Sequence, residues 1–84
     1  MSRLEKETER LKSRPKDYTY DEAKSLLNKL GFFENNKGRT SGARVEFKDN
    51  SGRKLILHKP HPGNILKTYQ INDVVNELEK WRVI

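Results

Sequence analysis

Residues 43–58 read ARVEFKDNSGRKLILH, and this stretch decides the fold. Two runs in which apolar and polar side chains alternate are separated by a turn rich in Asp, Asn, Ser and Gly. Alternation with a period of two is typical of a strand with one buried face, and such a turn favours a hairpin. Val45 and Phe47 share a face in the first run, and Leu55 and Leu57 share a face in the second. We therefore predict an antiparallel hairpin with these four side chains in the core.

An amphipathic helix is predicted on each side of the hairpin, over residues 20–30 and 69–81. Thr19 and Glu22 have the spacing of a capping box for the first helix, and Thr68 is the expected N-cap of the second. The apolar positions of both helices recur at i, i+3, i+4 and i+7: Ala23, Leu26, Leu27 and Leu30, then Ile71, Val74, Val75 and Leu78. Each helix therefore has one face to bury against the sheet.

A short strand is expected to begin at Phe32 and Phe33, after Gly31 ends the first helix. We expect Phe32, Phe33 and Phe47 in the core, whereas the sequence leaves open whether Trp81 covers the core or contacts a partner. The element order is then α-β-β-β-α. It predicts an α+β fold in which a three-stranded antiparallel sheet packs against two helices, and 84 residues suffice for one such domain.

Residues 1–17 are predicted to be a charged extension that precedes the domain of residues 18–84. Leu4 and Leu11 are one heptad apart, and Pro15 ends any helix that contains them. Because two leucines give only a narrow apolar face, we expect a marginal helix that docks loosely on the domain or frays.

The positive charge is concentrated in the middle of the chain. Residues 37–67 contain eight basic and two acidic side chains, so this stretch accounts for the whole net charge of +6. Charge placed on one side favours a polyanionic partner, and RNA is the partner we expect. The alternative is a solvated basic face that only keeps the protein in solution.

Composition also excludes several classes of protein. The chain contains no cysteine, which excludes disulfides, thiolate nucleophiles and Cys-ligated zinc. No apolar run approaches the ~18 residues of a membrane span, and the charged N-terminus lacks the apolar segment of a signal peptide. We therefore expect a cytoplasmic protein without a membrane partner.

The turn at residues 38–42 is bounded by glycines and is a candidate anion cradle. Backbone N–H groups of such a turn can point at a phosphate, and side-chain donors lie in and beside it: Arg39, Thr40, Ser41 and Arg44. A simple strand connection also favours Gly and Ser. Arg44 should share the polar strand face with Glu46, so it either contacts phosphate or pairs with that carboxylate.

His58 and His61 are the only candidates for a general base. RNA cleavage without a metal requires a base for the 2′-hydroxyl proton, and a basic neighbourhood favours the neutral imidazole that can act as one. The alternatives are that His61 fixes its loop by a hydrogen bond and that His58 faces solvent. Two histidines three residues apart lack the further ligands of a metal site, so no metal or other cofactor is expected.

Four segments together resemble the HicA-like toxin components of bacterial toxin–antitoxin pairs. They are LLNKLGF at 26–32, GRTSG at 38–42, RKLILH at 53–58 and HPGNILK at 61–67. The resemblance extends over about residues 18–80. It implies a fold like that of a double-stranded-RNA-binding domain and a small metal-independent endoribonuclease that cleaves mRNA and is silenced by a HicB-like antitoxin.

The chain departs from the family pattern at the start of the second strand. Typical members carry a histidine beside the Gly-Ser motif, where this chain has Ala43 and Arg44. His61, in the segment that matches the family, is then the first candidate for the catalytic base, and His58 is the second. The candidate RNA-binding residues are Lys37, Arg39, Thr40, Ser41, Arg44, Lys54, Lys59 and Lys67. Two alternatives remain open: a nucleic-acid-binding domain without catalysis, and a module whose basic face binds an acidic protein.

Overall fold

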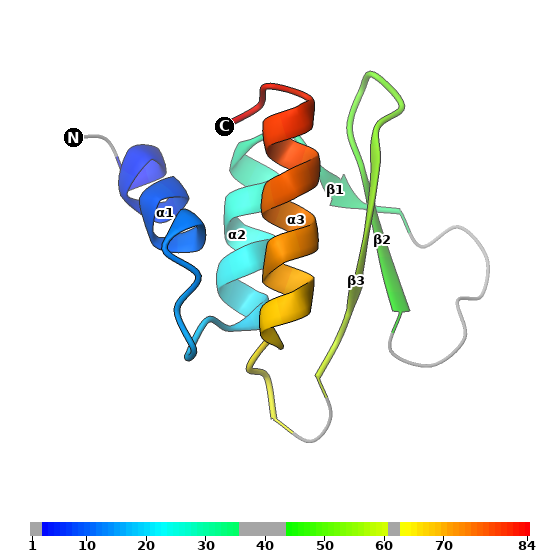
Figure 1. The fold of residues 1–84 in the computed structure, drawn as a ribbon. Helices are drawn as coiled ribbons and strands as arrows, with labels where there is room; N and C mark the ends of the chain where they lie inside the picture. The colour runs from blue at the N-terminus through cyan, green and yellow to red at the C-terminus, as the bar shows by residue number, and fades with distance from the viewer. Residues whose placement is uncertain (1–2, 36–43, 61–62) are drawn as a thin grey trace.

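The computed structural model describes residues 3–35, 44–60 and 63–84 (Figure 1). Its elements are α1 (Arg3–Lys12), α2 (Tyr20–Lys29), β1 (Phe33–Glu34), β2 (Arg44–Lys48), β3 (Lys54–His58) and α3 (Thr68–Lys80). From α2 onward the predicted α-β-β-β-α order is confirmed. This is the arrangement, like that of a double-stranded-RNA-binding domain, that the resemblance implies. Within the described residues, no helix has the length and apolar character needed to cross a bilayer.

The sheet is antiparallel with strand order β1-β2-β3, and the predicted hairpin is its larger part. Val45 pairs with Leu57 and Phe47 pairs with Leu55 across the hairpin, and all four side chains are buried. The turn is closed by Asp49, whose carboxylate Oδ1 accepts hydrogen bonds from the backbone N–H groups of two residues that follow it in the turn. The predicted phase of both strands is therefore correct.

The helices form two layers on one face of the sheet, as Figure 1 shows. Helices α2 and α3 lie next to the sheet, and α1 packs on their far side, against both of them. The opposite face of the sheet has no helix of the described residues over it. The alternate residues of β2 and β3 that point to this face therefore stay accessible, and we call it the outer face.

Helix α2 begins as predicted, but α3 does not. Thr19 and Glu22 form the capping box of α2, each side chain bonding the other residue's backbone N–H. Lys67 is the N-cap of α3, and its side chain makes no capping hydrogen bond. Thr68 is instead the first helical residue, so its prediction as the N-cap was wrong. The first turn of α3 consequently begins without a side-chain acceptor on its N–H groups.

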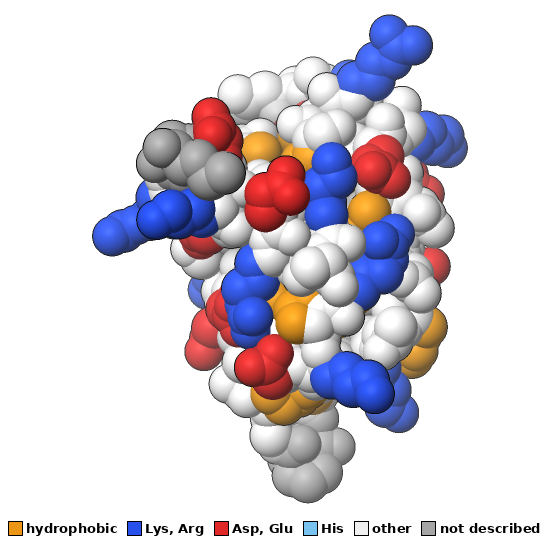
Figure 2. All heavy atoms as spheres, turned by 60° about the vertical axis from the view of Figure 1, so that its left-hand side comes forward, with side chains coloured by type: hydrophobic (Ala, Val, Ile, Leu, Met, Phe, Trp, Pro, Cys, Tyr) orange, Lys and Arg blue, Asp and Glu red, His pale blue; other side chains and the backbone are white. Residues whose placement is uncertain are grey.

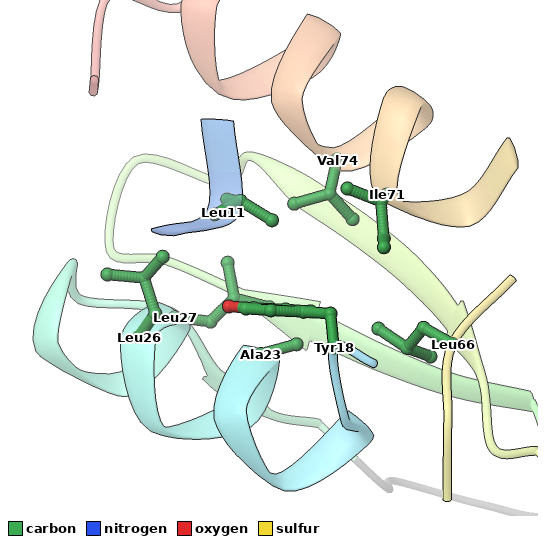
Figure 3. A pocket seen from close by; sticks show the side chains of 8 residues that line it. All are labelled: Leu11, Tyr18, Ala23, Leu26, Leu27, Leu66, Ile71 and Val74. Carbon is green, nitrogen blue, oxygen red and sulfur yellow. The ribbon is translucent and has the colours of Figure 1, made fainter. Parts of the chain in front are cut away.

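Helix α1 contributes Leu11 to the core, which its charged sequence did not predict. The Leu11 side chain is 1% exposed and lies over the ring of Tyr18, between α2 and α3 (Figure 3). The surrounding apolar side chains fill the space so closely that no water molecule fits between them. Ion pairs between Arg10 and Glu22 and between Lys29 and Glu7 join the polar sides of α1 and α2.

The aromatic residues divide between the core and the surface. Phe32 and Phe47 are fully buried, as predicted, but Phe33 is 58% exposed, so its assignment to the core was wrong. Phe33 pairs with Lys48 in the sheet, and the alternation of a strand directs both side chains to the outer face. Trp81 stacks on Phe32 with ring centroids 5.9 Å apart, and thus covers the core.

Candidate nucleic-acid interface

The first residue of β2 and the last residue of β3 are direct neighbours on the outer face. Arg44 and His58 are paired across the hairpin, and both side chains are exposed. Side chains at such a pair lie about 5 Å apart at their Cβ atoms. The alternative that Arg44 pairs with Glu46 is not observed: the Glu46 carboxylate accepts a hydrogen bond from the Asn35 amide at 2.8 Å, and Arg44 has no ion pair with a described residue.

A cleft of about 320 Å³ lies beside this pair, where β3 ends and α3 begins. We call it the basic cleft, and its lining residues are His58, Lys59, Pro60, Ile65, Lys67, Tyr69 and Gln70. The lining contains two lysines and a histidine but no carboxylate. In the described part of the chain, neither lysine forms an ion pair. The cleft is therefore suited to an anionic ligand.

Gln70 joins the two walls of the basic cleft. Its side chain is 7% exposed. The amide oxygen accepts the backbone N–H of His58 at 2.8 Å, and the amide nitrogen donates to the His58 carbonyl at 3.3 Å. Because one side chain from α3 satisfies both backbone groups, it fixes the end of β3 relative to the start of the helix.

The segment that leads into α3 is fixed to the start of α2 by backbone hydrogen bonds. The Tyr20 N–H donates to the carbonyl of Asn64, and the Leu66 N–H donates to the carbonyl of Tyr18, both at 2.8 Å. The Leu66 side chain is buried in the core. These bonds hold the wall of the cleft that carries Lys67.

Lys59 lies over an aromatic ring at the side of the cleft. Its ammonium nitrogen is 5.5 Å from the ring centroid of Tyr20, a distance at which a cation is attracted to the ring face. The Tyr20 hydroxyl donates to a carboxylate oxygen of Glu34 at 3.3 Å. Burial, together with the nearby Glu34 carboxylate, raises the pKa of Tyr20 well above its ordinary value. The face of the Tyr20 ring therefore supports the Lys59 ammonium group at the side of the cleft.

The start of α3 adds a positive end and an exposed aromatic ring. No acidic residue lies in the first turn of the helix. Its N–H groups and the positive end of the helix dipole favour an anion such as a phosphate. Tyr69 lies beside them with 57% of its surface exposed, which leaves its ring free to stack on a base. Positive charge and an accessible ring are the two features that single-stranded nucleic acid requires.

The structure brings together only part of the predicted site. Arg44, Lys59 and Lys67 lie at the end of the hairpin with His58, whereas Lys54 lies at the opposite end of β3, about 13 Å along the strand. Other predicted residues lie outside the described residues: Lys37, Arg39, Thr40, Ser41 and His61. No group of three metal-ligating side chains occurs among the residues that the structure describes.

Tyr69 and Gln70 were not among the site residues predicted from the sequence. Helical periodicity separates Tyr69 from the apolar positions of α3 and places it outside the buried face, and this is the signal that could have identified it. Gln70 gives no comparable signal, because its role depends on the end of a strand that is 12 residues away in the sequence.

Comparison with known proteins identifies one family. A family model described as "HicA toxin of bacterial toxin-antitoxin" matches residues 20–80, from the first residue of α2 to the last residue of α3. No match was found among curated proteins or among solved structures.

Proposed function

Since the chain belongs to the HicA toxin family of toxin–antitoxin systems, we propose that it is the RNA-binding toxin of a HicA/HicB-like pair. The observation that carries the proposal is the basic cleft. Two lysines and the start of α3 line it together with an exposed tyrosine, and no carboxylate lies among them.

The proposed ligand is the backbone of an RNA strand. Its phosphates contact Lys59, Lys67 and the N–H groups at the start of α3, while Arg44 binds a further phosphate on the outer face. An unpaired base stacks on Tyr69. Phosphate contacts of this kind make affinity depend steeply on salt, because each one releases counterions from the RNA.

For the reaction we propose metal-independent cleavage of mRNA, with His61 as the general base. His61 lies in the HPGN segment that resembles the family. At the start of the second strand, where typical members carry a histidine, this chain has Ala43 and Arg44. A cation beside the scissile phosphate stabilises the negative charge that develops there. Arg44 is the candidate, because it lies at the end of the hairpin from which the chain continues toward His61. His58 is the second candidate for the base.

The binding proposal is tested with labelled single-stranded and duplex RNA across a series of salt concentrations. The double variant Lys59→Ala/Lys67→Ala should bind more weakly, and its log–log salt dependence should be shallower by at most about two units. The matched control is Lys6→Ala/Lys80→Ala, which removes the same charge from exposed positions on α1 and α3 outside the cleft. Equal losses in both double variants would mean that net charge, not the cleft, attracts the RNA.

A further inference from the structure

Strand β3 is an edge of the sheet, and part of its backbone faces outward. In an antiparallel ladder, alternate residues bond the neighbouring strand, and the others direct their N–H and C=O groups away from it. The Asp49 N–H donates to the Arg53 carbonyl at 3.1 Å, which fixes the phase of this alternation at the turn. The residues of β3 whose backbone groups point away from β2 are therefore Lys54, Ile56 and His58.

Gln70 confirms this phase, because it reaches the edge of β3 and bonds both outward-facing groups of His58. It occupies the place that a residue of a fourth strand would take. No hydrogen bond from a described residue reaches the outward groups of Lys54 and Ile56. The edge is therefore closed at His58 and open over the preceding residues.

A groove of about 440 Å³ runs along the open part of this edge, between β3 and α3. We call it the edge groove, and its lining residues are Lys54, Leu55, Ile56, Asp73, Val74, Asn76 and Glu77. The strand side carries the cation of Lys54 and the part-exposed side chain of Ile56. The helix side carries the carboxylates of Asp73 and Glu77. The two sides of the groove thus differ in charge.

From this geometry we infer that the edge groove binds an extended segment of the antitoxin, which adds a fourth strand to the sheet beside β3. The inference rests on the toxin–antitoxin pairing of the proposed function. Strand addition satisfies open backbone groups and reads alternate side chains on the two faces. Side chains of the segment on the outer face lie beside Lys54 and are acidic, with an apolar residue beside Ile56. Side chains on the other face meet Asp73 and Glu77 and are basic.

Charge favours the antitoxin segment over two other possible occupants of the edge groove, a second copy of the chain and RNA. In a second copy of the chain paired edge to edge about Ile56, Lys54 would lie opposite His58 and the acidic sides of two α3 helices would face each other. RNA phosphates would meet Asp73 and Glu77 at the helix side of the groove. A segment with alternating charge avoids both conflicts. Because Gln70 already bonds both outward backbone groups of His58, the antitoxin segment can pair only with the stretch from Lys54 to Ile56.

Amide hydrogen exchange of the full chain, alone and with the HicB-like antitoxin of the proposed pair, tests this inference. In the free chain, the amides of Lys54 and Ile56 should exchange rapidly, because both point into the groove. In the complex they should become protected, whereas the amide of His58, already bonded to Gln70, should change little. Rapid exchange of Ile56 in a stable complex would overturn the inference.

Two variants test the groove independently. Asn76→Trp fills it from an exposed helical position and should weaken antitoxin binding at least about tenfold. Its matched control is Glu79→Trp, which places the same ring on α3 outside the groove and should bind as the parent does. Ile56→Pro removes the outward N–H while sparing the ladder to β2, a position where an edge strand tolerates proline, and should also weaken binding.

The outcomes separate this inference from the proposed function. If the complex forms equally well with both tryptophan variants, the antitoxin binds elsewhere and only the strand addition is refuted. If no complex forms with the parent chain, the pairing and the strand addition are both refuted, while RNA binding by the basic cleft is measured separately. Dimerisation of the free chain that Asn76→Trp abolishes would identify a second copy as the occupant instead.

Discussion

The face formed by α1 and α2 differs from the basic cleft in how its charges are arranged. On the α1–α2 face, cations and carboxylates alternate, as Figure 2 shows on that side of the molecule. Arg10 pairs with Asp17 and Glu22, and Lys29 pairs with Glu7. In the basic cleft, Lys59 and Lys67 have no carboxylate among the lining residues.

This difference indicates which face holds the fold together and which is available to a ligand. Paired surface charges add a small local stabilisation and leave little net field outside the protein. Cations that gather without partners repel one another and produce a field that attracts a polyanion. Both regions are built on the same core, so they can be changed independently only while that core stays intact.

The largest expected effect is the loss of the shared core. Leu27 on α2 is fully buried, and Leu27→Ala should lower the free energy of unfolding by about 2–4 kcal/mol, because the cavity it leaves cannot close completely. Urea denaturation measures the change. Leu4→Ala, at a 36% exposed position of α1, is the control and should cost less than about 0.5 kcal/mol. An equally small effect at Leu27 would contradict the packing of α2.

The second prediction asks whether the chain carries out chemistry on the RNA as well as binding it by charge. His61→Gln should slow RNA cleavage in the presence of EDTA by about 10²-fold or more, while RNA affinity stays within a few-fold. Both are measured on one folded preparation. His58→Gln, at the second candidate for the base, should slow cleavage less than His61→Gln does; the reverse order would identify His58 as the base. If His61→Gln cleaves at the parental rate, His61 is not the general base.

The third prediction separates the outer face from the α1–α2 face. Arg44→Ala should weaken RNA binding and reduce the log–log salt dependence by about one unit, as expected for the loss of one phosphate contact. Arg3→Ala removes the same charge from an exposed position on α1 and should leave the salt dependence almost unchanged. Identical salt slopes for Arg44→Ala and the parent would remove Arg44 from the RNA-binding surface.

Local patterns in the sequence predicted most of the fold. The alternation around Val45 and Phe47 gave the hairpin in its correct phase, and the capping box at Thr19 gave the start of α2. Phe33 was assigned to the core because of its hydrophobicity, but its place in a two-residue strand turns it to the outer face. A strand so short has no alternation from which its phase can be read.

The features of the core and of the site that were not predicted depend on contacts between distant segments. Gln70 is recognisable as the residue that closes the edge of β3 only when the end of that strand is known to lie beside α3. Leu11 joins the core because α1 folds back over Tyr18, an arrangement that two leucines in a charged segment do not specify. Lys59 and Lys67 were both selected by charge, but their gathering in one cleft follows from the tertiary fold.

The smallest expected effect concerns the paired charges of the α1–α2 face in acid. Hydrogen bonds from Arg10 and from the Thr19 backbone hold the pKa of Glu22 below its ordinary value of 4.5, although partial burial opposes them. Because the folded pKa is the lower one, the unfolded chain takes up the proton first as the pH falls. The contribution of Glu22 to stability is therefore complete above about pH 5 and is lost as the pH falls through the folded pKa.

Glu22→Gln should be less stable than the parent at pH 7, and the difference should narrow at pH 3. The effect should stay below about 1 kcal/mol, because the Glu22 side chain is 36% exposed and water screens the pair. Glu9→Gln, on the exposed side of α1, is the control. A Glu22→Gln difference that is as large at pH 3 as at pH 7 would show that packing, not the charge of this carboxylate, joins α1 to α2.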